Sequence, residues 1–230
     1  MDSQDTDDGI RAIAFDYGGV LAHFIEDEIL CHMADAAGVS TEVFSPLYWQ
    51  LRPGYDNGEL GLHDYWHALL DRSNSPVDRE MSIPVLAELD GVGWSRMNAA
   101  IIRWVFECGR AGYRRLLISN MSESAYEMII ADRSWAKLFE VHIISGLIGM
   151  NKPAPGIFKE AWKRTGLSPE EILFLDDSER NVGAACELGM HAVQVTGAAE
   201  LSKQLQQRFP TVPCESLICR NRITPHAEAR

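Results

Sequence analysis

The chain has 230 residues, and its 21 basic and 33 acidic side chains give a formal net charge of -12 at pH 7. With 46% hydrophobic and 23% charged residues, its composition is that of a globular protein, not of a disordered or membrane-embedded one. The acidic balance disfavours sequence-independent nucleic-acid binding and docking on anionic membranes, because both need clustered Lys and Arg. We therefore expect neither nucleic acid nor a membrane as a partner.

The N-terminal sequence and the cysteines indicate the cellular compartment in which the protein is expected. No apolar run approaches the roughly 18 residues of a spanning helix. The first residues, MDSQDTDDG, are acidic where a secretory signal would be basic. The five cysteines are odd in number and lack the Cys-x-x-Cys spacing of a metal or redox motif. We therefore expect a reduced, cytoplasmic protein.

The chain starts with an acidic stretch over residues 1–9 and then reaches its first predicted strand. IRAIAF, residues 10–15, is a short apolar run typical of a buried parallel strand. It leads directly into DYGGV, where the paired glycines predict a turn with close backbone approach.

Residues 22–95 have a different pattern, which predicts a helical insert. Apolar residues recur every three or four positions in ILCHMADAAG, EVFSPLYWQL and LHDYWHALLDR, as they do along amphipathic helices. Pro53-Gly54 and Asn57-Gly58 are expected to separate these helices. Strand-like runs are scarce in this region.

Beyond residue 95, helices and strands alternate. The helical pattern AAIIRWVFECGRAG comes first, and further helices are predicted for SESAYEMIIADR, PGIFKEAWKRTG and NVGAACELG. Between them RRLLIS, EVHIIS, ILFLD and HAVQV are strand-like. This alternation predicts an α/β fold with a mostly parallel sheet covered by helices on both faces. The expected core comprises residues 10–21 and 96–213, with peripheral tails at 1–9 and 214–230.

Polar side chains follow the predicted strands at the points where these end. In parallel sheets, ligands bind at the carboxyl ends of the strands. Carboxylates and donors suited to an anion therefore meet at one edge of the predicted sheet. The residues are Asp16, Ser119, Asn120, Lys152, Asp176 and Asp177.

Four segments at these positions resemble, in order, the four motifs of the haloacid dehalogenase superfamily: FDYGGV, LLISN, NKPAPGIF and FLDDSERNVGAACELG. The resemblance covers roughly residues 10–196 and implies a Rossmann-like core with residues 22–95 as a small helical cap. Within the superfamily, the chain looks similar to bacterial α-glucose-1-phosphate phosphatases and to the phosphatase domain of soluble epoxide hydrolase.

The resemblance implies a Mg²⁺-dependent phosphatase that acts on a small phosphorylated metabolite, such as a sugar phosphate. Asp16 would attack phosphorus to form an aspartyl-phosphate that water hydrolyses. Lys152 would take part in catalysis and bind substrate by neutralising its charge, and Ser119 and Asn120 would hydrogen-bond the phosphoryl oxygens. Mg²⁺ prefers oxygen ligands. The implied ligands are Asp16, Asp176, Asp177 and the backbone carbonyl of Gly18.

Simpler structural roles stay open for several of these residues. An Asp at the end of a buried strand, such as Asp16, often only caps a turn, and Asp177 could cap the helix that follows it. Asn181 fits the Asp-Asp-x-x-x-Asn pattern and is expected to fix the loop rather than contact substrate. The cap aromatics, among them Trp49 and Trp66, are expected in the cap core, although those facing the site could touch substrate.

Gly18 departs from the first motif of most phosphatases in this superfamily, which have there a second Asp as general acid and base. A glycine cannot deliver a proton, and general acid catalysis typically contributes about 10²–10⁴-fold. We favour a phosphatase whose leaving group needs little protonation, such as a sugar 1-phosphate or an acyl phosphate.

Two other functions stay open. A 2-haloacid dehalogenase also lacks the second Asp, but it needs no metal, and the Asp176-Asp177 pair argues against it. A non-catalytic or regulatory relative would bind a phosphorylated metabolite or a protein partner. Such a protein has no need of Asp16, Lys152 and the acidic pair together.

Overall fold

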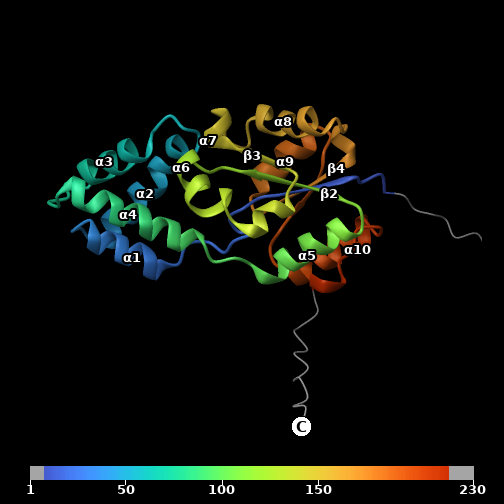
Figure 1. The fold of residues 1–230 in the computed structure, drawn as a ribbon, viewed down its shortest axis with the longest axis horizontal. Coiled ribbons are helices and arrows are strands. Elements are labelled where there is room, and N and C mark those ends of the chain that lie inside the picture. The colour runs from blue at the N-terminus through green and yellow to red at the C-terminus, as the bar shows by residue number, and fades with distance from the viewer. Residues whose placement is uncertain (1–7, 218–230) are drawn as a thin grey trace, which may run out of the picture.

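The computed structural model describes residues 8–217, in which an α/β core and a helical cap lie side by side along the long axis (Figure 1). The core sheet has five parallel strands in the order β3-β2-β1-β4-β5. They are β1 (Ala12–Phe15), β2 (Arg114–Ser119), β3 (Val141–Ile144), β4 (Ile172–Asp176) and β5 (His191–Gln194). The predicted α/β class with a parallel sheet is confirmed.

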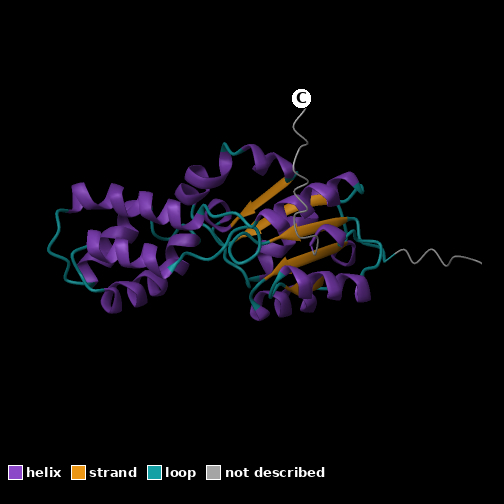
Figure 2. Ribbon diagram, turned by 90° about the horizontal axis from the view of Figure 1, so that it is seen from below, coloured by secondary structure: helices purple, strands orange, loops and turns teal. Residues whose placement is uncertain are grey.

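Helices cover both faces of the sheet because its strands are apolar on both faces. In β1, Ile13 and Phe15 pack toward α5 (Ala99–Arg110) and α10 (Ala198–Arg208). Ala12 and Ala14 belong to the other cluster, with α8 (Pro155–Thr165) and α9 (Glu179–Glu187). Figure 2 shows the strands between these helices. The predicted two-sided covering is therefore confirmed.

The register of the sheet decides where the strands deliver their polar ends. Phe15 lies beside Leu117 on one side and Leu175 on the other. Asp16 and Asp176, the next residues along β1 and β4, therefore leave the sheet side by side. The strand arrows in Figure 2 point toward the cap, so this edge faces it.

The cap consists of four helices packed against one another: α1 (Asp27–Ala36), α2 (Thr41–Asp56), α3 (Leu62–Arg72) and α4 (Arg79–Trp94). They lie within residues 22–95, the range expected for the insert. The two chain segments that join the cap to the core are paired, because His23 N donates to Arg96 O at 2.9 Å and Asn98 N to Leu21 O at 2.8 Å.

The prediction that Pro53-Gly54 separates two helices is wrong. α2 continues through Pro53 to Asp56 because the buried face of the helix holds it in place, although a proline removes one backbone donor and crowds the preceding turn. That face includes Phe44, Tyr48, Leu51 and Tyr55. Asn57-Gly58 does end the helix, and Gly58 has a φ of 81°, which favours glycine.

Short elements complete the core. They are α6 (Glu123–Tyr126), the π-helical turn η1 (Glu127–Ala131), η2 (Ser134–Leu138), α7 (Ser145–Ile148), η3 (Pro169–Glu171) and η4 (Glu215–Leu217). The helix predicted for SESAYEMIIADR is thus present as α6 and η1. Its second half takes the wider π turn, in which the adjacent Ile129 and Ile130 are both buried.

The expected tails at 1–9 and 214–230 lie largely outside the described residues. At the C-terminal end, Cys214 and Leu217 are buried, and the Trp104 indole donates to the carbonyl of Pro213. The packed core therefore reaches residue 217. Across residues 8–217, no helix has the length and apolar character needed to cross a bilayer.

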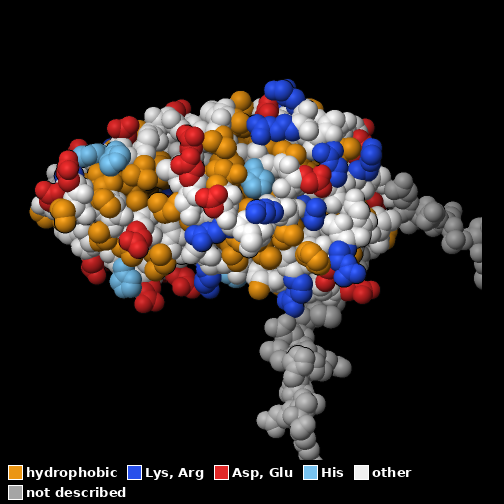
Figure 3. All heavy atoms as spheres, in the orientation of Figure 1, with side chains coloured by type: hydrophobic (Ala, Val, Ile, Leu, Met, Phe, Trp, Pro, Cys, Tyr) orange, Lys and Arg blue, Asp and Glu red, His pale blue; other side chains and the backbone are white. Residues whose placement is uncertain are grey.

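Charge is distributed unevenly over the surface. On the face drawn in Figure 3, Asp and Glu predominate over the cap, whereas Lys and Arg gather mainly over the core. The net charge of -12 therefore does not describe the local charge at any one site.

Candidate active site

A cavity of about 140 Å³ lies at the carboxyl edge of the sheet, between the core and the cap. Six of the seven residues predicted for the site line it: Asp16, Gly18, Ser119, Asn120, Lys152 and Asp177. The seventh, Asp176, is fully buried and contacts Lys152 directly. The fold thus brings residues from four strand ends and their following loops to one place.

Lys152 is the buried cation at the centre of this site. Its Nζ lies 2.6 Å from Asp16 Oδ1 and 2.7 Å from Asp176 Oδ2, and it donates to the carbonyl of Ile118 at 2.9 Å. Burial alone lowers the pKa of Lys152, but the two carboxylates outweigh this effect and keep the pKa above its ordinary value. Lys152 therefore holds its positive charge.

Asp176 is held from three directions. Besides Lys152, the amide of Asn181 donates to both of its carboxylate oxygens, at 3.0 and 3.1 Å, and Ser178 N donates to Oδ1 at 2.9 Å. Asn181 thus fixes the carboxylate of Asp176, as expected for a residue that orders the loop.

The side chain of Asn120 fixes the backbone of Lys152. The side-chain oxygen of Asn120 accepts from Lys152 N at 2.7 Å, and its amide donates to Lys152 O at 3.0 Å. Its side chain is therefore a positioning group for Lys152. The predicted contacts of Ser119 and Asn120 with a phosphoryl group stay predictions, while Ser119 is buried at the end of β2 and lines the cavity.

Three carboxylates form a set suited to a divalent cation. One oxygen each from Asp16, Asp176 and Asp177 lies within 4.8 Å of the others. Burial raises the pKa of Asp16 to about 8, although Lys152 lowers it. Burial, and then the neighbouring Asp176, raise the pKa of Asp177. Crowded carboxylates with such raised pKa values, partly balanced by Lys152, fit an oxygen-binding cation such as Mg²⁺.

The helix-capping alternative for Asp177 does not match the structure. The N-cap of α9 is Ser178. Gly19, with a φ of 72°, lets the backbone pass beside Asp177, because a Cβ on Gly19 would lie 2.8 Å from Asp177 Cγ. The second glycine of DYGGV therefore makes room for a carboxylate of the acidic set.

Gly18 lies against a tryptophan of the cap. A Cβ at Gly18 would be 3.0 Å from Cζ3 of Trp94, the last residue of α4. The Tyr17 hydroxyl donates to Trp94 O at 2.7 Å, and Trp94 Nε1 donates to the Tyr48 hydroxyl at 2.9 Å. A fixed indole ring thus occupies the space into which a side chain at position 18 would extend.

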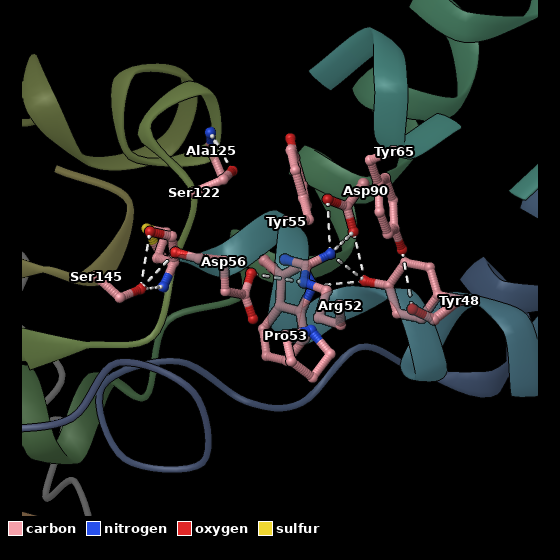
Figure 4. A network of polar contacts seen from close by, with 12 residues as sticks. Tyr48, Arg52, Pro53, Tyr55, Asp56, Tyr65, Asp90, Ser122, Ala125 and Ser145 are labelled. Carbon is pink, nitrogen blue, oxygen red and sulfur yellow. Dashed lines mark hydrogen bonds and ion pairs between the residues drawn. The ribbon is translucent and has the colours of Figure 1, made fainter. Parts of the chain in front are cut away.

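A second buried cation lies on the cap side of the cavity. Arg52 binds Asp56 through Nε at 3.0 Å, and its Nη1 binds Asp90 Oδ1 at 3.0 Å and the Tyr48 hydroxyl at 2.8 Å (Figure 4). The Tyr48 hydroxyl donates to Asp90 at 2.5 Å. This group of polar contacts links α2 to α4 and holds Tyr48, the partner of Trp94.

Comparison with known proteins decides the family. Residues 10–189 match the sequence profile of haloacid dehalogenase-like hydrolases. The chain belongs to this family. The resemblance inferred from the four motifs is therefore confirmed, and the chain is a haloacid dehalogenase-like hydrolase.

Three curated relatives illustrate the range of this family. Drimenol cyclase drtB of Aspergillus calidoustus is 32% identical over 87% of this chain and 37% of its own length. Rat bifunctional epoxide hydrolase 2 is 25% identical over 89% of this chain and 40% of its own. This chain thus spans about two fifths of these two relatives. Sesquiterpene phosphatase astK of Aspergillus oryzae is 24% identical over 86% of this chain and 95% of its own length.

Solved structures of haloacid dehalogenase-like proteins share the fold. A predicted hydrolase from Porphyromonas gingivalis has a TM-score of 0.68 and 24% identity, covering 86% of this chain and 98% of its own. A family enzyme from Bacteroides thetaiotaomicron, in complex with magnesium and inorganic phosphate, has a TM-score of 0.66 and 20% identity, covering 80% and 93%. At these identities the likeness concerns the fold.

Several residues around the cavity were not predicted from the sequence. Trp66 is fully buried in the cap core, as expected, whereas Trp49, which was also expected there, is 42% exposed and lines the cavity. The helical spacing of apolar residues marks both as helix residues but does not say which one faces the core. Phe24, Arg52 and Trp94 also line the cavity. These residues become neighbours of the site only when the cap packs on the core.

Proposed function

We propose that this haloacid dehalogenase-like hydrolase is a Mg²⁺-dependent phosphatase that hydrolyses a small phosphorylated metabolite through an aspartyl-phosphate on Asp16. The observation that supports this most is the set of Asp16, Asp176 and Asp177 around the buried cation Lys152. The match to a sesquiterpene phosphatase, over 86% of this chain and 95% of that protein, supports the reaction type.

Asp16 is placed to act as the nucleophile. Tyr17 N and Lys152 Nζ both bind its Oδ1 at 2.6 Å, which fixes the orientation of the carboxylate in the cavity. In the first step a bond forms between a carboxylate oxygen and phosphorus, and the bond from phosphorus to the ester oxygen breaks. Water then hydrolyses the acyl phosphate, which releases inorganic phosphate and restores Asp16.

The other site residues act through charge and position. Mg²⁺ bound by Asp16, Asp176, Asp177 and the Gly18 carbonyl would neutralise the charge that an anionic nucleophile meets at a phosphate dianion. Lys152, held by Asn120, adds a fixed positive charge where the transferred phosphoryl group must lie. Ser119 at the end of β2 would donate to its oxygens.

The chain offers no acid at position 18, and Trp94 occupies the space beside it. The leaving group must therefore depart with little protonation or take its proton from water. This favours phosphates of acidic alcohols, phenols or acids over phosphates of simple alcohols.

Phosphate release from acetyl phosphate and p-nitrophenyl phosphate tests the proposal. We expect turnover with Mg²⁺, none with EDTA, and a loss of at least about 10⁴-fold in kcat for Asp16→Asn, because the nucleophile is removed. Asp132→Asn, at an exposed position outside the cavity, is the matched control and should keep full activity.

Two outcomes would replace the proposal. Metal-independent halide release from 2-chloropropionate would instead support a dehalogenase. Binding of inorganic phosphate with Mg²⁺, but no turnover of acetyl phosphate or p-nitrophenyl phosphate, would support a non-catalytic relative.

A cytoplasmic location belongs to the same proposal. Among the described residues, Cys31, Cys108, Cys186 and Cys214 are free thiols, which suits a reducing compartment. Detection of the protein in the soluble, cytoplasmic fraction of its cells would support this location, and detection only in an exported fraction would contradict it.

A further inference from the structure

Three aromatic side chains form one wall of the catalytic cavity. Trp94 packs edge-to-face on both Phe24 and Trp49, with ring centroids 6.0 and 6.2 Å away and interplanar angles of 68° and 87°. All three line the cavity that holds Asp16 and Lys152. We call these three residues the aromatic wall.

The aromatic wall is apolar surface left open to solvent at a catalytic site. Phe24 is 50% exposed and Trp49 is 42% exposed, whereas Trp94 is 9% exposed. Large apolar side chains in a concave site mark the binding of an apolar group. The wall is also fixed in place, since Trp94 is held by Tyr17 and Tyr48.

Three polar side chains that line the same cavity are paired within the protein. Arg52 is bound to Asp56, Asp90 and Tyr48. The side chain of Asn120 binds the backbone of Lys152, and that of Asn181 binds Asp176. These pairings leave fewer free donors and acceptors for the hydroxyl groups of a sugar.

The size of the cavity directs the organic part of a substrate past Trp49. About 140 Å³ leaves little room beside a phosphoryl group. An adjoining, more open cavity of about 700 Å³ shares Trp49, Arg52 and Lys152 with the first. Its lining includes apolar Pro53 and Pro153 as well as polar Ser178 and Arg180 at its open side, and Oδ1 of Asn151 is buried there without a hydrogen-bond partner. A group carried by the phosphate thus extends along Trp49 into this space.

We infer that the aromatic wall binds a planar, unsaturated, apolar group on the substrate, so that the enzyme prefers aryl or prenyl monophosphates to sugar phosphates. This inference rests on the proposed phosphatase function. Aryl and prenyl groups share the flat apolar face that packs on aromatic rings. They differ in the leaving group, because a phenolate departs without an acid and an allylic alkoxide does not.

The first experiment compares kcat/KM with Mg²⁺ for 1-naphthyl phosphate, geranyl monophosphate, glucose 1-phosphate and glucose 6-phosphate, with acetyl phosphate as the reference. We expect at least one apolar ester to exceed both sugar phosphates by about tenfold or more. Since Gly18 supplies no acid, naphthyl phosphate should have the higher kcat of the two apolar esters.

The second experiment uses variants of the wall. Trp49→Ala should lower the ratio of kcat/KM for the preferred apolar ester to that for acetyl phosphate by about tenfold, mainly through KM. Trp49→Phe should restore most of this ratio. Val43→Ala, on the same helix, exposed and outside both cavities, should leave the ratio unchanged. Urea denaturation of each variant checks the fold.

Failure of the inference can be told apart from failure of the proposed function. If acetyl phosphate is hydrolysed but a sugar phosphate is preferred, or if Trp49→Ala leaves the ratio unchanged, the inference is wrong and the phosphatase proposal stands. If Mg²⁺-dependent phosphate release occurs neither with any of the esters nor with acetyl phosphate, both are wrong.

Discussion

The core and the cap each contain a buried cation between two aspartates. In the core, Lys152 lies between Asp16 and Asp176, at 2.6 and 2.7 Å. In the cap, Arg52 lies between Asp56 and Asp90, with both distances 3.0 Å. The two groups have the same formal charges and similar burial. We nevertheless propose a catalytic role for the group in the core and a structural role for the group in the cap.

What separates them is a further carboxylate and the geometry of the cation. Asp177 adds a third negative charge to the core group, which is then left with a formal charge of -2. The planar guanidinium of Arg52 instead binds two carboxylates and the Tyr48 hydroxyl at once. An excess of crowded carboxylates therefore indicates a cation site better than a buried ion pair does.

Removal of the buried cation of the core, Lys152, should cause the largest change of activity. Lys152→Met is expected to lower kcat for acetyl phosphate by about 10³-fold, since a fixed charge at the transferred phosphoryl group is lost. Lys163→Met, at an exposed lysine of α8, is the control and should retain activity. Equal activity of the two variants would remove Lys152 from the mechanism and weaken the contrast with the cap.

Disruption of the ion pairs of Arg52 in the cap should mainly lower the stability of the protein. Asp90→Asn removes one of the charges around Arg52, and we expect the free energy of unfolding in urea to fall by about 3 kcal/mol. Asp71→Asn, which breaks a largely exposed pair with Arg79, should cost less than about 1 kcal/mol. Similar losses for both variants would mean that the buried pair does not hold the cap together.

A smaller effect should appear in the pH dependence of stability. Burial raises the pKa of Asp56 to about 6, and Asp90 adds to the rise, whereas Arg52 lowers it. The unfolded chain releases this proton nearer pH 3.8, so the contribution of Asp56 to stability is present below that pH and is lost as pH rises through about 6.

Asp56→Asn measures this effect, because asparagine does not titrate. Relative to this variant, the wild type should gain about 1 kcal/mol of unfolding free energy between about pH 7.5 and about pH 5. A stability difference that is flat over this range would show that Asp56 is ionised in the folded protein at both pH values.

The sequence was most informative where residues near each other in the chain make the structure. The apolar runs around 12–15 and 172–176 become strands because both of their faces are buried, and their ends bring Asp16 and Asp176 together. The acidic pair and Lys152 are likewise recognisable as motifs, since each follows directly from a strand or loop position.

Contacts between the cap and the core could not be predicted in this way. The periodicity of apolar residues does not predict that Trp66 is buried and Trp49 is exposed, because the exposure of each side chain depends on where α2 and α3 pack. Nor does it show that Trp94 lies on Gly18. The prediction at Pro53 is wrong for a related reason, since packing of the α2 face outweighs the lost backbone hydrogen bond and the steric crowding of the proline ring.

The contact between Gly18 and Trp94 bears on how such a protein can change. These two residues belong to different parts of the chain but lie in contact, so a side chain at position 18 would need the indole to shift by a few tenths of an ångström from where Tyr17 and Tyr48 hold it. The position of the cap tryptophan thus limits which side chains the first motif can carry at position 18.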